Sequence, residues 1–290
     1  MLIACLLLFV TATTPSNGDL KKPDVDRAWT ILKAGVSDSH ADKRAKAVRA
    51  LGLAPENQEI REMAERALTD QNTDVRTEAA TALGQMHATA AIPKLKDALK
   101  DKELSVVLAS TNALYTMKDP LAYDVYYAIV TGQRKSGVGL VQSQLDMLHN
   151  RKQVEKLAFE TGVGFVPFGS VAYEAWKTLT RGDSGAVVAQ ALERLSTDPD
   201  PKSQKAIEDA CYDAKWQVRA AAVAALAKRG NPSALDYVVS AMQDDSDIVE
   251  YEAAAAVIYL SARTETHPRP GSRRRATPNR GTHANSGASE

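Results

Sequence analysis

The chain has 290 residues, and its 36 basic and 36 acidic side chains give a formal net charge of zero. Balanced charge argues against a dedicated nucleic-acid-binding protein, because such a protein carries an excess of Lys and Arg. The length suits one or two compact domains or a single solenoid.

The N-terminal stretch is strongly apolar. Residues 2–10 contain no charged side chain, and Val10-Thr11-Ala12 offers the small-residue context of a cleavage site. Such a run is typical of a secretory signal peptide and is too short to span a bilayer. We therefore predict a signal peptide over residues 1–18 and an exported protein.

The mature fold is expected to open with a helix that begins near Asp24, followed by a helical pair over residues 41–53 and 58–68. Terminal units of a repeat array are often atypical because they cover the open end of the core. Trp29, on the apolar side of the first helix, is interpreted as a core residue of such a capping helix.

A pair of helical patterns at residues 72–84 and 91–101 recurs along the chain. The Ala-Leu pair at 82–83 returns at 113–114 and again at 225–226, and the Ala-Leu-Gly at 82–84 has an earlier copy at 50–52. One helical pair cannot bury its own apolar face, so the pairs must stack on one another. The even spacing predicts a helical solenoid with repeats over residues 19–130 and 183–260.

Each unit carries local structural signals. Asp74 precedes the first helical turn and is expected to cap it, whereas Gly84 is expected to end the helix in the left-handed conformation. Pro93 falls in the first turn of the second helix, where its missing N–H costs least. Arg76 and its counterpart Arg219 are expected to pack between units and to bond turn carbonyls or Asp side chains.

These residues resemble a known repeat. Asp74-x-Arg76, Ala79-Ala80, Ala82-Leu83-Gly84 and Ala91-Ile92-Pro93-x-Leu95 are similar to the HEAT motif in its short bacterial form, the PBS-lyase-type HEAT-like repeat, and residues 215–222 are a second match. The resemblance covers most of residues 38–260. It implies an all-α fold, a right-handed α-solenoid of HEAT-like helical pairs interrupted by a Gly-rich helical insert. It also implies an armadillo-like scaffold that binds other proteins. Together with the predicted signal peptide, this places the expected scaffold in the bacterial periplasm or cell envelope.

The predicted helix over residues 121–130 is rich in tyrosine. The register shift that carries the Ala-Leu pair at 82–83 onto 113–114 also carries Ile92 and Leu95 onto Tyr123 and Tyr126, so we expect these two rings in the core. Tyr127 corresponds to a lysine and is expected at the surface, as a candidate interaction residue.

The repeat breaks between residues 131 and 182, a stretch rich in glycine. The sequence favours a helical hairpin packed on the solenoid, because uncharged runs of this length are more often buried than membrane-bound. The second interpretation is a surface that meets an apolar partner or a membrane. Arg134 and Lys135 would then lie near lipid head groups, and Phe165, Phe168 and Trp176 would insert as a wedge.

The C-terminal end changes composition. Residues 261–290 carry six arginines against two glutamates together with Pro and Gly. This stretch cannot bury a core and predicts a disordered basic tail. It is either an electrostatic tail for anionic surfaces or a non-native extension. Within the preceding repeats, Cys211 falls at the register position of Leu99 and Met242 and is expected to be buried.

No catalytic constellation is recognisable in the sequence. The five histidines are not spaced as a helical metal pair requires, and Asp183-Ser184-Gly185 is interpreted as a helix N-cap rather than a nucleophile. We expect no catalytic, cofactor-binding or metal-binding residue, and hence a non-catalytic scaffold with unidentified protein partners and no specific nucleic acid. Two alternatives stay open: a bilin-lyase-like accessory enzyme that handles a chromophore, and a membrane-surface adaptor acting through the insert.

Overall fold

The computed structural model describes residues 22–131 and 185–266, and within them every regular element is helical, which confirms the predicted all-α class. The N-terminal half contains α1 (Lys22–Val36), α2 (Ala41–Ala50), η1 (Leu51–Leu53), α3 (Gln58–Ala67), α4 (Thr73–Gln85), η2 (Thr89–Ala91), α5 (Ile92–Ala98), α6 (Leu104–Thr116) and α7 (Leu121–Thr131). The C-terminal half contains α11 (Gly185–Leu195), α12 (Pro201–Ala210), α13 (Trp216–Arg229), η3 (Pro232–Ala234), α14 (Leu235–Ala241) and α15 (Asp247–Thr266).

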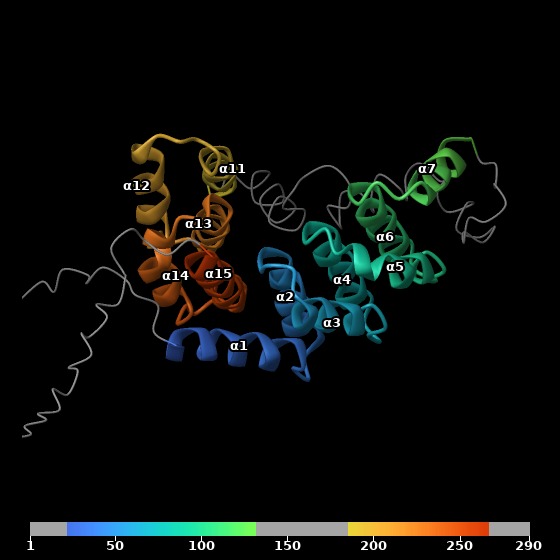
Figure 1. Cartoon of the computed structure of the whole chain (residues 1–290), viewed down its shortest axis with the longest axis horizontal. Coiled ribbons are helices and arrows are strands. Elements are labelled where there is room, and N and C mark those ends of the chain that lie inside the picture. Colours follow the sequence, from blue (N-terminus) through green and yellow to red (C-terminus); the bar gives the residue numbers. More distant parts are fainter. Residues whose placement is uncertain (1–21, 132–184, 267–290) are drawn as a thin grey trace, which may run out of the picture.

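The helices form two rows. The inner-row helices pack side by side in the order α11, α13, α15, α2, α4 and α6, and Figure 1 shows them along the inside of an arch. The outer row consists of α12, α14, α1, α3, α5 and α7, which pack against the inner row from outside. This two-row stacking is that of an α-solenoid.

The order along the solenoid differs from the order of the sequence. The inner row passes from α15 directly to α2, so the first described helices, α1 and α2, lie in the middle of the described solenoid, and α7 and α11 lie at its opposite ends. The helix α1 packs against both α15 and α2 and supplies the outer-row helix of the unit that α15 begins. We call the contact of α1 and α2 with α15 the seam.

Close packing at the seam shows in Gly35 of α1. A Cβ atom there would lie 2.7 Å from Ala47 Cβ in α2 and 2.7 Å from Tyr251 Cε1 in α15. The expectation that the first helix caps an open end is therefore wrong, because α1 fills an internal position. Trp29 is partly buried against the core all the same.

The core repeats with the sequence. Leucines at one register position are fully buried in four of the units, namely Leu51, Leu83, Leu114 and Leu226. Burying each such side chain contributes about 1.5–3 kcal/mol. Four consecutive alanines of α15, residues 253–256, are also fully buried because this helix has neighbours in both rows.

The start of α4 differs from the expectation. Its N-cap is Asn72, whose side chain accepts hydrogen bonds from the N–H groups of Asp74 and Val75. Asp74 therefore lies inside the first turn, where its charge still complements the helix dipole. Pro93 lies in the first turn of α5, at the position where a missing N–H costs least.

Gly84 also has a different role from the expected one. It lies inside α4, and the residue with positive φ is His87, at 52°. A Cβ atom on Gly84 would lie 3.0 Å from both Cα and Cβ of Ala113 in α6. The glycine is thus required for the close approach of two inner-row helices, not for ending a helix.

The helix α15 continues to Thr266, past Leu260, where the sequence places the end of the repeat. The predicted signal peptide and the tail beyond residue 266 lie outside the described residues, as do the candidates Arg134, Lys135, Phe165, Phe168 and Trp176. None of the described helices combines the length and the apolar character that crossing a membrane demands.

Candidate functional site

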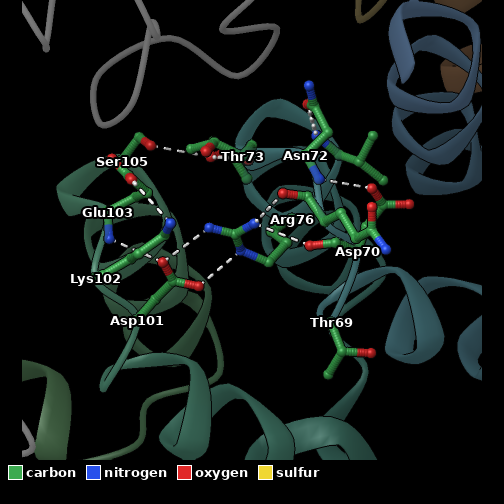
Figure 2. A network of polar contacts seen from close by, with 12 residues as sticks. Thr69, Asp70, Asn72, Thr73, Arg76, Asp101, Lys102, Glu103 and Ser105 are labelled. Carbon is green, nitrogen blue, oxygen red and sulfur yellow. Dashed lines mark hydrogen bonds and ion pairs between the residues drawn. The ribbon is translucent and has the colours of Figure 1, made fainter. Parts of the chain in front are cut away.

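Arg76 bridges two consecutive units. Its Nε and Nη2 donate to the two carboxylate oxygens of Asp101 at 2.7 and 3.1 Å, and Nη1 donates to the carbonyls of Asp70 and Gln71 at 2.9 and 3.1 Å. Figure 2 shows the guanidinium between the turn before α4 and the turn before α6. Asp101 also accepts the N–H of Glu103, so one carboxylate holds both the arginine and the start of the next helix.

The same contact, which we call a rung, recurs elsewhere. Arg219 of α13 donates to the two carboxylate oxygens of Asp244 at 2.6 and 2.7 Å, and Arg44 of α2 donates to those of Asp70 at 2.9 Å each. Each arginine also bonds two carbonyls of the turn before its own helix. Arg44 was not identified from the sequence, although it precedes Arg76 by the same register step that separates the two Ala-Leu-Gly motifs.

The rungs are partly buried, and the hydrogen bonds from their arginines shift the pKa values of the carboxyl groups. The hydrogen bond from Arg44 holds the pKa of the Asp70 carboxyl below its ordinary value, although burial acts in the opposite direction. At Asp244 burial favours a higher pKa, but hydrogen bonds led by that from Arg219 outweigh it and the pKa is lowered. These rungs are therefore ionised at neutral pH and hold neighbouring units in register.

Three inner-row helices lack the rung arginine. Its position is taken by Val188 in α11, by the buried Val107 in α6 and by Glu250 in α15. Because Glu250 cannot donate a hydrogen bond when ionised, no rung ties α15 to α2 across the seam. Instead, Asp247 of α15 lies 3.6 Å from Nζ of Lys43 and 3.3 Å from Nζ of Lys46, both of α2.

An exposed aromatic surface lies at the α6–α7 end of the solenoid. Tyr115 of α6 is 46% exposed, and in α7 Tyr123 is 58% and Tyr127 43% exposed. The ring of Tyr115 meets those of Tyr123 and Tyr126 edge to face, with centroids 5.6 and 5.9 Å away. Burial raises the pKa of Tyr126, the least exposed ring of the group. We call Tyr115, Tyr123 and Tyr127 the tyrosine surface.

The prediction that Tyr123 lies in the core was wrong. Its counterpart Ile92 begins α5, which packs against α6 of the following unit. Among the described residues, no inner-row helix follows α6 to cover α7 in the same way, and Tyr123 is exposed. Tyr127, named from the sequence as a surface residue, is exposed beside it.

The described groups do not assemble a metal centre. Within residues 22–131 and 185–266, no three His, Cys, Asp or Glu side chains lie close enough together to hold a metal ion. Burial raises the pKa of the Cys211 thiol to about 12, so this cysteine is not a nucleophilic thiolate at neutral pH. Like Leu99 and Met242 in their units, it follows the last residue of an outer-row helix and is buried.

Three solved structures show distant similarity. Human deoxyhypusine hydroxylase in complex with glycerol has 16% sequence identity and a TM-score of 0.33, over 83% of this chain and 98% of that chain. An engineered protein has 13% sequence identity and a TM-score of 0.27, over 81% of this chain and 97% of that chain. A designed armadillo repeat protein has 15% sequence identity and a TM-score of 0.24, over 80% of this chain and 98% of that chain. At TM-scores below 0.5 none of them bears on the function of this chain. The comparison with curated proteins found no match.

The family model of HEAT repeats matches residues 30–115 and 174–258. The two matched regions contain all three rungs, at Arg44, Arg76 and Arg219, and together they make up more than half of the chain. The chain belongs to the HEAT-repeat family.

Proposed function

We propose that this chain is a non-catalytic protein-interaction scaffold, exported to the bacterial cell envelope, that binds a partner protein through the tyrosine surface. The observation that carries the proposal is the exposure of Tyr115, Tyr123 and Tyr127 at one end of the solenoid. Export is supported by the apolar residues 2–10 of the sequence.

Tyrosine suits a protein contact for physical reasons. Its ring offers a large apolar area while its hydroxyl hydrogen-bonds, and tyrosine is enriched at interfaces for that reason. The edge-to-face contact between Tyr115 and Tyr123 holds both rings before a partner arrives, so less side-chain entropy is lost on binding. The Arg76 rung keeps α4 and α6 in register and gives the surface a rigid support.

The test is the double variant Tyr123→Ser with Tyr127→Ser in the full chain. Both rings are exposed, so the melting temperature should stay within about 3 °C of the parent value. Tyr212→Ser is the matched control, because Tyr212 is 68% exposed in the other half of the chain. We expect envelope proteins captured by the parent and by the control to be lost from the double variant.

The contradicting result is equally definite. If parent, control and double variant capture the same proteins in the same amounts, the tyrosine surface is not the binding site. A quantitative comparison of the captured proteins by mass spectrometry separates the two outcomes.

A further inference from the structure

Ionisable side chains from three neighbouring inner-row helices meet at the seam. Glu252 of α15 and Glu78 of α4 stand two positions after the rung position of their helices, and Arg49 belongs to α2 between them. Arg49 Nη2 lies 3.4 Å from Glu252 Oε1, and the same guanidinium acts electrostatically on Glu78. One arginine therefore serves two carboxyl groups.

Glu252 has an unusual environment for an acid. Its side chain is only 5% exposed, and its Oε2 atom is buried without a hydrogen-bond partner. The ionised form is strongly disfavoured there because Oε2 loses its hydration and gains no donor, although Arg49 lies 3.4 Å from Oε1. The neutral acid pays a much smaller desolvation penalty.

The seam also lacks the rung that ties α2 to the turn before α4, α4 to the turn before α6, and α13 to the turn before α15. Glu250 stands in place of the rung arginine. Its pKa is raised, mainly by burial and secondly by the negative charge of Asp247, while the positive charges of Arg27 and Lys43 oppose the rise. If all three of its acidic side chains were ionised, α15 would place three carboxylates at the boundary with α2, namely Asp247, Glu250 and Glu252. We infer that the seam is a proton-controlled joint: α15 packs tightly on α2 while the Glu252 carboxyl carries a proton, and the two halves of the solenoid loosen when it ionises.

The direction of the effect follows from linkage. Burial raises the pKa of Glu252 from 4.5 to about 7; Arg49 opposes this rise and Glu78 adds to it. The packed seam therefore binds a proton that the loosened seam releases. The stabilisation from this proton is complete below about pH 4.5, declines as the pH rises and is lost above about pH 7.

Other charged groups near the seam have partners of their own. Lys46 of α2 pairs with Asp247 of α15 across the seam and with Asp42 of its own helix. Arg27 of α1 donates to the carbonyl of Met242 at 3.3 Å. On the α13 side the register position of Glu252 holds an alanine, Ala221.

The imidazole in the turn before α2 is the other group to control for. His40 bonds Asp38 Oδ1 at 3.0 Å and is largely exposed. A His40→Asn variant separates any contribution of this imidazole from that of Glu252.

The experiment is hydrogen exchange of the full chain at about pH 5.5 and about pH 8, corrected for intrinsic exchange rates. We expect peptides from α15 and α2 to exchange about tenfold or more faster at the higher pH relative to peptides from α4 and α6. Glu252→Gln keeps the shape of the neutral acid, so its exchange should stay slow at both pH values. The variants His40→Asn and Glu65→Gln, the latter on α3, should show the same pH-dependent increase in exchange as the parent protein.

A second measurement keeps the inference testable should the glutamine variant fold poorly. Carbon-13 NMR of the parent side-chain carboxyl groups reports the titration of Glu252 directly, and a midpoint near neutral pH is expected. The inference is overturned by a Glu252 midpoint near 4.5, by a pH step that persists in a folded Glu252→Gln variant, or by equal exchange of α15 and α2 at both pH values.

Discussion

Arg76 and Asp101 stand 25 positions apart and join two consecutive units by a pair of hydrogen bonds, 2.7 Å from Nε and 3.1 Å from Nη2. Because the arginine also bonds two carbonyls of the turn before its own helix, one side chain fixes three segments. Equivalent contacts at Arg44 and Arg219 make this relationship the repeated joint of the solenoid.

Arg76→Ala should destabilise the fold by about 2–4 kcal/mol, because it removes the bidentate hydrogen bond to the Asp101 carboxylate and the donor of two turn carbonyls. The arginine side chain is only 8% exposed, so water replaces these bonds poorly. Urea denaturation followed by circular dichroism measures the loss.

Arg66→Ala is the control for Arg76→Ala. The Arg66 side chain is 68% exposed and lies 4.0 Å from Glu62, so its removal should cost less than about 0.5 kcal/mol. Equal losses in the two variants would show that the rung contributes nothing beyond an ordinary surface charge.

Asp70→Asn tests the ionisation of a rung. Hydrogen bonding to Arg44 lowers the pKa of Asp70 in the folded chain, so its contribution is present above the ordinary value of 3.8 and is lost as the pH falls through the folded pKa. The variant should therefore lose about 1–2 kcal/mol at neutral pH and progressively less in acid. Thermal melting across this pH range gives the difference, and a cost independent of pH would contradict the assignment.

Gly84→Ala should destabilise by about 1–3 kcal/mol, because the new methyl group would stand 3.0 Å from Cα and Cβ of Ala113. Combining it with Ala113→Gly removes one of the two opposing atoms and should recover part of the loss. Denaturation of both single variants and the double variant forms a mutant cycle, and strict additivity would exclude the contact.

The local fold could be predicted from the sequence because the apolar period and the turn residues repeat. The register alone aligned Arg76 with Arg219 and Asp101 with Asp244, and the structure gives both pairs the same hydrogen bonds. The role of Gly84 could not be read in this way, since the composition of one helix does not show how closely its neighbour approaches.

The position of α1 could not be predicted either. Its apolar side, with Ala28 and Leu32 fully buried, requires a neighbour but does not say which one. Pairing with α15 depends on residues far away in the sequence, as the bond from Arg27 to the Met242 carbonyl illustrates. Tyr123 was misplaced for a related reason, because a register position predicts burial only where a following unit covers it.

The candidate interaction residues could be predicted only in part. Tyr127 is exposed, whereas Tyr115 was not named, because nothing in its own helix pattern marks it as a surface aromatic residue. The ring stands at the register position of Gly84, where a following inner-row helix would pass too close for any side chain.

The joining of the two halves at the seam is tested most directly by zero-length carbodiimide coupling of the full-length monomer. Lys46 Nζ and Asp247 Oδ2 lie 3.3 Å apart although 201 positions separate them, so an amide bond between these residues, absent from an Asp247→Asn variant, is expected in the peptide mass spectrum. Lys94 and Glu65, 2.8 Å apart within the N-terminal half, provide the internal control. If the monomer couples Lys94 to Glu65 but couples neither Lys46 nor Lys43 to Asp247, the two halves are not joined into one solenoid through the contact of α15 with α2.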